Sequence, residues 1–109
     1  MNGGVPEITV QELKGKIDRK EKFVLVDVRE PNEFEIGRIP GSRLIPLGDV
    51  ASRANELDTA DDIVLHCKMG GRSAKALKVL QTLGFKKLKN LKGGITAWSD
   101  QIDPSVPKY

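Results

Sequence analysis

The 109-residue chain is poor in the residues that build disulfides and metal sites, with one cysteine, Cys67, and one histidine, His66. A single cysteine cannot form an intramolecular disulfide, and one Cys with one His cannot complete a zinc site. Aromatic residues make up only 5% of the chain, so the sequence offers no stacking platform for nucleic acid. We therefore expect neither a metal ion nor a nucleic-acid partner.

The sequence also lacks long apolar runs and a strong excess of one charge. No run approaches the ~20 apolar residues of a membrane span, and residues 1–6 are polar and glycine-rich, unlike a signal peptide. Eighteen basic and fifteen acidic residues leave a net charge of +3. We expect most charges on solvated faces; a weaker alternative gathers the excess around an anion site. The free thiol and the polar start favour the cytoplasm.

Short apolar runs alternate with amphipathic stretches along the chain. Residues 23–26 and 63–65 are apolar without alternation, which is typical of strands covered on both faces. Further strand candidates lie at 8–10, 44–45 and 88–91. The alternation predicts one α/β domain, with a mostly parallel sheet and helices on both faces.

Helix signals separate these runs. Four features predict helices: a capping box at Thr9 and Glu12, Pro31 in a first turn, apolar spacing over 47–57 and 73–83, and a short segment at 95–98. Gly84 is expected to end the helix before it. Residues 8–100 form the predicted domain. Residues 1–7, with Asn2-Gly3-Gly4, are predicted to be a linker, and residues 101–109 a loose tail.

The segment with the clearest chemistry runs from Cys67 to Ser73 and reads Cys-Lys-Met-Gly-Gly-Arg-Ser. It follows a buried-strand pattern and precedes a helix, and ligands bind at such junctions in parallel sheets. Adjacent glycines allow positive φ, and successive N–H groups there can form an anion nest at the helix N-terminus. With Lys68 and Arg72 nearby, we predict a lowered Cys67 pKa and a reactive thiolate.

Plainer interpretations exist for each of these residues. A lone cysteine at a strand end is often a buried small hydrophobe, but the glycine-rich loop favours a nucleophile here. An extended chain would point His66 away from Cys67, which favours packing or hydrogen bonding over a general base. Asp27 and Arg29 follow the 23–26 run, and we favour a supporting role for both over an exposed ion pair.

The loop resembles the active-site loop of the rhodanese superfamily, which opens with cysteine and closes with arginine. Three other segments resemble family motifs, so the likeness covers residues 8–98. They are Val26–Glu30 (the D-V-R-E strand end), Phe34 with Gly37–Ser42 (E-F-x-x-G-H-I-P-G-A) and Leu91–Trp98 (L-x-G-G-x-x-x-W). Arg38 replaces a common histidine, and Lys68 and Met69 replace the usual first loop residues. These departures leave the sulfur donor open.

The resemblance implies a sulfurtransferase that carries sulfur as a persulfide on Cys67 and needs no other cofactor. It implies a persulfide-binding loop and an ion pair between Asp27 and Arg72, with Arg29 also supporting. The loop residues are Lys68, Met69, Gly70, Gly71, Arg72 and Ser73. Phosphatases of the superfamily have five residues between cysteine and arginine, whereas Cys67 and Arg72 enclose four. The shorter loop favours sulfur transfer. A non-catalytic binding module, which usually lacks the cysteine, is the alternative of another class.

The segment from Trp98 to Tyr109 resembles the C-terminus of proteins that fuse an adenylating, ubiquitin-activating-like domain to a rhodanese domain. That resemblance implies a β-grasp sulfur-carrier protein as the acceptor and an adenylating domain on the same chain. The implied pathways are molybdopterin synthesis, tRNA thiolation and cysteine synthesis. The donor would be thiosulfate or a persulfide-bearing protein. A free-standing thiosulfate sulfurtransferase is the alternative within the enzyme class.

Overall fold

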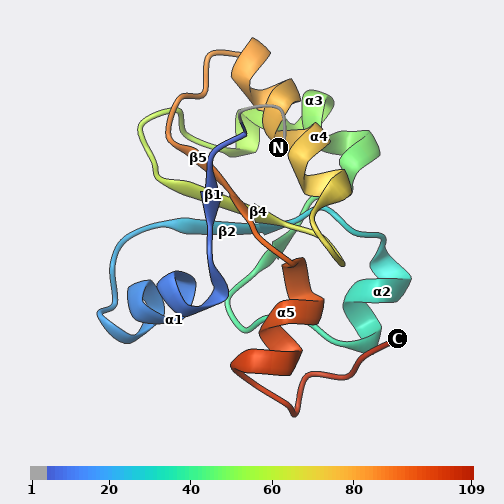
Figure 1. Ribbon diagram of the computed structural model, residues 1–109. Helices are drawn as coiled ribbons and strands as arrows, with labels where there is room; N and C mark the ends of the chain where they lie inside the picture. The colour runs from blue at the N-terminus through green and yellow to red at the C-terminus, as the bar shows by residue number, and fades with distance from the viewer. Residues whose placement is uncertain (1–4) are drawn as a thin grey trace.

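A computed structural model describes residues 5–109, so the linker-like Asn2-Gly3-Gly4 lies outside the described residues. Five strands form one sheet in the order β1-β5-β4-β2-β3, and every neighbouring pair is parallel (Figure 1). The strands are β1 (Glu7–Ile8), β2 (Val24–Asp27), β3 (Arg43–Leu44), β4 (Ile63–His66) and β5 (Leu88–Leu91). The parallel α/β prediction is confirmed.

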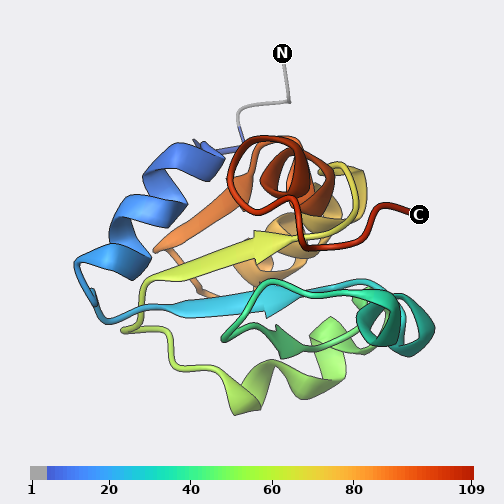
Figure 2. The same cartoon turned by 90° about the horizontal axis from the view of Figure 1, so that it is seen from below.

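Helices cover both faces of the sheet, as predicted. Figure 2 shows α1 (Val10–Asp18) and α5 (Gly94–Gln101) above the strands and α3 (Val50–Arg53) below them. The longest helix, α4 (Gly71–Thr82), shares the face of α3 and packs on β4 and β5. The short α2 (Pro31–Ile36) follows the carboxyl end of β2, away from both layers (Figure 1). None of the helices within residues 5–109 is long and apolar enough to cross a membrane.

The sheet separates two apolar cores. Ile63, Leu65 and Cys67 join the core beneath α3 and α4, whereas Val64 joins the core beneath α1 and α5. All four residues of β4 are buried, as the unalternating apolar run predicted. This central strand delivers Cys67 to the carboxyl end of the sheet.

Local signals fixed several helix ends. The Thr9 hydroxyl accepts the Glu12 N–H at 3.1 Å, and the Glu12 carboxylate accepts the Thr9 N–H at 2.9 Å, which confirms the capping box. That cap ends β1 at Ile8, so Val10 lies in α1 and not in the strand expected at 8–10. Pro31 begins α2 as predicted, and Gly84 follows α4 with φ +94°.

The prediction of one continuous helix over residues 47–57 is wrong. The segment is a 3₁₀ turn η1 (Leu47–Asp49), the four-residue α3, and a second 3₁₀ turn η2 (Ala54–Glu56). Gly48 and Asn55 are weak helix formers, and packing fixes the segment mainly through the buried Val50. The apolar spacing therefore located the buried face but not the backbone conformation.

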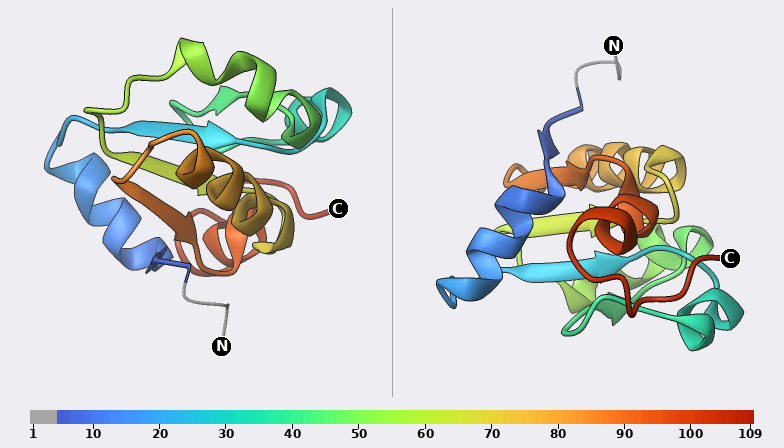
Figure 3. Two further views of the ribbon diagram at one scale, coloured as in Figure 1. Left: turned by 90° about the horizontal axis from the view of Figure 1, so that it is seen from above. Right: turned by 60° about the horizontal axis from the view of Figure 1, so that its bottom comes forward.

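The ends of the described chain are packed rather than loose. Val5 and Val106 are buried in the two cores. The Pro6 carbonyl accepts the Asn90 N–H at 2.8 Å, and the Ser99 hydroxyl donates to the Val106 carbonyl at 2.6 Å. The expectation of a linker through residue 7 and a loose tail from residue 101 is therefore wrong for residues 5–7 and for the tail. Figure 3 shows the tail running from α5 towards α2.

Candidate active site

Cys67 follows β4 immediately and is almost fully buried. Its sulfur lies inside the turn that begins α4, where the Gly70 N–H donates to Sγ at 3.1 Å and the Ser73 hydroxyl lies 3.3 Å from it. Gly70 has φ +118°, a conformation that side-chain-bearing residues rarely adopt. This glycine therefore turns the chain so that its amide faces the sulfur.

Burial raises the pKa of the Cys67 thiol, because a thiolate loses its solvation. Hydrogen bonds from the Ser73 hydroxyl and from the amides of Ser73, Gly70 and Met69 outweigh burial, so the pKa lies below its ordinary value. The lowered direction and the contribution of the loop amides are as expected, whereas the Ser73 hydroxyl, and not the charges of Lys68 and Arg72, is the largest stabilising contribution. Arg72 is paired with Glu33, and the Lys68 ammonium lies 4.5 Å from the centre of the Tyr109 ring.

The N-terminus of α5 holds the loop from behind. The Ile95 N–H donates to the Cys67 carbonyl at 3.0 Å, and the Thr96 N–H donates to the Lys68 carbonyl at 3.1 Å. Gly94 has φ +58°, and a Cβ placed on it would lie 2.4 Å from the Lys68 oxygen. The Gly93-Gly94 pair at the start of α5 therefore allows this helix to approach the loop backbone and orient it.

Arg72 forms a two-pronged ion pair with Glu33 on α2. Its Nη1 and Nη2 donate to the two carboxylate oxygens at 2.7 and 2.9 Å. The expected pairing of Arg72 with Asp27 is wrong, because the Asp27 carboxylate is buried at the end of β2 and engaged by Arg29. Arg72 thus belongs to the rim of the site and links the loop to α2.

Asp27 and Arg29 form a fully buried ion pair, with Arg29 Nη2 donating to Asp27 Oδ2 at 2.7 Å. The remaining N–H groups of Arg29 reach the Gly37 carbonyl at 2.7 Å, the Glu33 carbonyl at 3.3 Å and the Tyr109 hydroxyl at 2.9 Å. None of these contacts involves the thiol. The pair instead anchors α2, which carries the partner of Arg72.

His66 lies behind the loop in a fully buried position. Its Nδ1 is 3.4 Å from the Cys67 carbonyl, and its Nε2 is 3.8 Å from Asp27 Oδ2 without a hydrogen-bond partner among residues 5–109. Burial lowers the pKa of His66, which keeps the ring neutral. This placement fits packing and not proton transfer at the sulfur.

The remaining loop residues are Met69 and Gly71. Met69 is the most exposed large apolar residue described, at 68% of its surface, and lies at the loop tip. Gly71 begins α4, and nothing lies within 4 Å of a Cβ placed on it. Arg38, at the position of the expected family histidine, stacks over Phe34 at 4.1 Å.

Three residues of the site were not predicted individually from the sequence. Glu33 and Tyr109 join Arg72 at the rim, where the Tyr109 hydroxyl donates to Glu33 Oε2 at 2.6 Å. Asn90 lies on β5 and contacts both Ser73 and Gly70. Asn90 carried no clear signal, because Lys89 beside it in the 88–91 segment is polar as well. The rim contacts join segments far apart in sequence.

Glu33 gives the rim a predicted pH dependence. The Arg72 guanidinium lowers the pKa of Glu33 to about 2, against desolvation that raises it. A carboxylate whose pKa is depressed on folding stabilises the protein above its unfolded value of about 4.5 and loses that contribution as pH falls towards 2. Because Arg72 is partly exposed, we expect a contribution of about 1 to 2 kcal/mol.

The measurement is urea unfolding at a series of pH values from neutrality to the acid limit. Glu33→Gln should be less stable than wild type at neutral pH, and the two curves should converge in acid. Glu35→Gln, at an exposed carboxylate of α2 with no ion pair or side-chain hydrogen bond among residues 5–109, serves as the control. Parallel curves for wild type and Glu33→Gln across the whole range would contradict the prediction.

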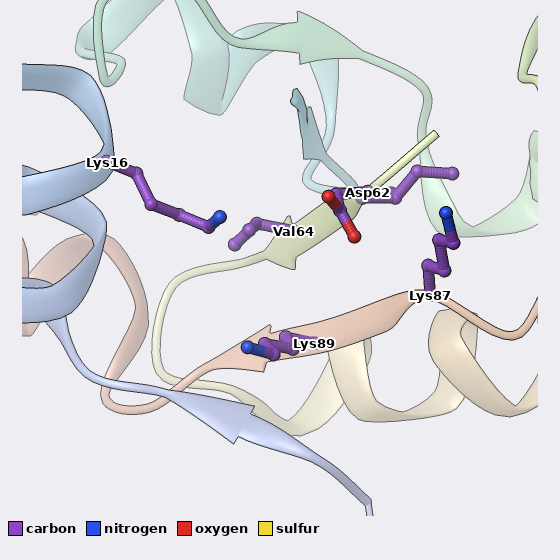
Figure 4. Close-up of a pocket in the computed structure, with 6 residues that line it drawn as sticks. Lys16, Asp62, Val64, Lys87 and Lys89 are labelled. Carbon is purple, nitrogen blue, oxygen red and sulfur yellow. The ribbon is translucent and has the colours of Figure 1, made fainter. Parts of the chain in front are cut away.

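A pocket lies at the end of the sheet away from Cys67. Figure 4 shows Lys16, Lys87 and Lys89 around the start of β4, with Asp62. Lys16 is paired with Glu21, and Lys87 donates to the Ala60 carbonyl at 3.2 Å. The pocket holds no candidate nucleophile, so the chemistry of the described residues concentrates at Cys67.

The site thus defines a class: α/β proteins with a low-pKa cysteine in an amide-lined loop at the carboxyl end of a parallel strand. Residues 9–101 match the rhodanese-like domain family. The chain belongs to that family, which includes proteins named as sulfurtransferases.

Individual relatives show the same relationship. The putative sulfur carrier protein YrkF of Bacillus subtilis is 40% identical, with 91% of this chain and 54% of YrkF covered. The probable adenylyltransferase/sulfurtransferase MoeZ of Mycobacterium tuberculosis is 39% identical, with 94% and 26% covered. A rhodanese-like domain protein from Staphylococcus aureus has a TM-score of 0.83 at 33% identity, with 90% and 95% covered. The chain thus spans 54% or less of the two curated relatives.

Proposed function

We propose that this protein is a sulfurtransferase that carries sulfane sulfur as a persulfide on Cys67. The observation that carries the proposal is the buried sulfur facing the Gly70 amide and the Ser73 hydroxyl, with a lowered pKa. A thiolate is the nucleophilic form of cysteine, so this environment supplies the attacking group without a histidine base. The family relationship supports the same chemistry.

The loading step with thiosulfate as donor is a displacement at sulfur. The Cys67 thiolate attacks the outer sulfur, the new Sγ–S bond forms, and the S–S bond of thiosulfate breaks. Sulfite leaves as a dianion with the bonding electron pair, Sγ becomes neutral, and the outer sulfur keeps its negative charge as the terminal sulfur of the persulfide. Charge and electrons balance, so the step needs no other oxidant, reductant or cofactor. The amides of the loop are placed to stabilise that terminal charge.

We further propose a sulfur-carrier protein as the acceptor, with the persulfide attacking its adenylated C-terminal carboxylate. Two relatives support this, since one is named a putative sulfur carrier protein and the other a probable adenylyltransferase/sulfurtransferase. The products would serve molybdopterin, thiolated-tRNA or cysteine synthesis. A free-standing sulfurtransferase is the second candidate, supported by the Staphylococcus aureus protein, 95% of which is covered by this chain.

Intact mass spectrometry after incubation with thiosulfate tests the proposal. We expect one added sulfur atom on the wild type, removed by cyanide or a thiol reductant, and none on Cys67→Ser. Ser52→Ala, at an exposed hydroxyl on α3, is the matched control and should load like the wild type. A sulfur-carrier protein, its adenylating enzyme and ATP, added to the loaded protein, should release AMP and form an acyl disulfide between Cys67 and the carrier if the carrier is the acceptor. A thiol added afterwards should reduce that disulfide and release the carrier thiocarboxylate.

The outcomes separate the candidate classes. If the wild type gains no sulfur from thiosulfate or from a protein persulfide, the enzyme interpretation fails and the non-catalytic binding module remains. Hydrolysis of an aryl phosphate without sulfur loading would identify a phosphatase instead. Loading followed by transfer to cyanide but not to the carrier would favour the free-standing enzyme.

A further inference from the structure

Asn90 is a buried polar residue at the base of the active-site loop. It lies on β5 opposite Leu65 of β4 and is 2% exposed. Its side-chain amide faces the start of α4, where Nδ2 donates to the Gly70 carbonyl at 3.1 Å and Oδ1 lies 2.5 Å from the Ser73 hydroxyl. Asn90 thus contacts both residues whose donors face the Cys67 sulfur.

The orientation of the Asn90 amide follows from these contacts. Turning it over would place Oδ1 against the Gly70 carbonyl and set two acceptors together. Oδ1 must therefore face Ser73. The Gly70 carbonyl also accepts the Ala74 N–H at 3.2 Å, so its hydrogen bonding does not depend on Asn90 alone.

The Ser73 hydroxyl has one proton and two acceptors that need it. Asn90 Oδ1 lies 2.5 Å from the hydroxyl oxygen, and Cys67 Sγ lies 3.3 Å from it. Both the serine and the asparagine are buried, so water does not substitute for a missing donor. The proton can satisfy Asn90 or the sulfur, but not both.

We propose that Asn90 is a positioning residue: it accepts the hydrogen bond of the Ser73 hydroxyl whenever Sγ is uncharged, and it loses that hydrogen bond only to the thiolate. In the thiol state, the S–H donates to Ser73 Oγ and the hydroxyl donates to Asn90. In the thiolate state, the hydroxyl rotates to the sulfur and Oδ1 loses its donor. Asn90 therefore stabilises the thiol relative to the thiolate.

The same competition favours the sulfur-loaded state, and this step rests on the proposed function. In a persulfide the negative charge lies on the outer sulfur, and Sγ is a neutral, two-coordinate atom. The Ser73 hydroxyl can then donate to Asn90 again, while the loop amides face the outer sulfur. A group that bonds better in one state than in another shifts the balance between them. Asn90 thus favours the persulfide over the thiolate.

Alkylation of Cys67 by iodoacetamide across pH tests the proton competition without any sulfur transfer. Asn90→Leu removes the acceptor, so the midpoint of the pH–rate curve should move to lower pH. At pH below that midpoint the rate should rise about threefold, because a tenfold larger thiolate fraction is partly offset by lower nucleophilicity. Ser73→Ala should move the midpoint to higher pH.

The decisive measurement is the double variant. If Asn90 acts through the hydroxyl, Asn90→Leu should change nothing in a Ser73→Ala background. The charged and titratable groups around the loop are identical in every variant: Arg72 with Glu33, Lys68 with Tyr109, and His66. An equal shift in both backgrounds would overturn the proposal, because Asn90 would then act through loop geometry alone. An unshifted single variant would overturn it as well.

Mass spectrometry at equilibrium with thiosulfate and sulfite tests the loaded-state claim. At a pH above the alkylation midpoint, where free Cys67 is the thiolate, the ratio of persulfide to free Cys67 should fall about tenfold in Asn90→Leu, the same factor by which its thiolate gains. Failure of the wild type to load would refute the proposed function but leave the alkylation result standing. Normal loading with an unshifted alkylation curve would refute the role of Asn90 alone.

Discussion

Replacing Gly94 by alanine should destabilise the fold by about 3 to 5 kcal/mol and remove most sulfur loading. A Cβ at this position would lie 2.4 Å from the Lys68 carbonyl oxygen and 2.6 Å from the Cys67 carbonyl oxygen. Both obstacles are backbone atoms, so no side-chain rotation relieves the overlap. The residue also has φ +58°, which adds the cost of a left-handed conformation.

The lost activity follows from where the strain is released. Relief requires α5 and the loop to separate, and the N–H groups of Ile95 and Thr96 hold the loop through those same carbonyls. Movement of Cys67 would break the alignment of its sulfur with the Gly70 amide at 3.1 Å. Misplacing a reacting group by about 1 Å costs on the order of a hundredfold in rate.

Gly84→Ala is a matched control for the strain alone. Gly84 has φ +94°, but nothing lies within 4 Å of a Cβ placed on it. Its replacement should cost about 1 to 2 kcal/mol and leave loading intact. Urea unfolding and the rate of persulfide formation measure both effects. Equal loss of stability in the two variants would mean that the approach of α5 to the loop is not tight.

The features that the sequence predicted are those set by neighbouring residues. The capping box at Thr9 and Glu12, the start of α2 at Pro31 and the glycine after α4 depend on contacts within one helical turn. The bounds of β5, Leu88–Leu91, match the expected segment, which a buried leucine begins and ends, although Lys89 is exposed.

The contacts that the sequence did not predict join distant segments. Arg72 and Glu33 are 39 residues apart, and Tyr109 reaches Glu33 across 76 residues. Local periodicity carries no information on which carboxylate will lie beside an arginine. The resemblance favoured Asp27 as that partner; the structure gives Asp27 to Arg29 because both are buried two residues apart at the end of β2. The packing of the tail was not predicted either, because its contact with Glu33 also joins residues far apart in the sequence.

Composition also misjudged the tail. Pro104 and Pro107 led us to predict a loose end. Pro107 instead packs against Gly37, and a Cβ placed on Gly37 would lie 2.8 Å from the Pro107 ring. Proline restricts the unfolded chain, so ordering this segment costs less entropy than composition alone suggests. The tail thus completes the rim through Tyr109, a contact that only the assembled fold defines.

Replacing Arg29 by methionine should cost about 3 to 5 kcal/mol, because it leaves the Asp27 carboxylate buried without its cation. Both side chains are fully buried, and the guanidinium donates to Asp27 and to the Gly37 and Glu33 carbonyls. Methionine matches much of the arginine stem, so the loss reflects charge and hydrogen bonding more than volume. We expect the urea midpoint to fall steeply.

Two further variants separate the possible causes. Arg53→Met removes the arginine of an exposed pair with Glu56 and should leave the midpoint nearly unchanged. Adding Asp27→Leu to Arg29→Met removes the stranded charge, so the double variant should recover part of the lost stability. The double variant could instead be less stable than Arg29→Met by the full cost of a second defect in the core. That result would show that the unpaired Asp27 carboxylate does not cause the loss of stability. Arg29 would then stabilise the fold mainly by holding α2, through the Gly37 and Glu33 carbonyls.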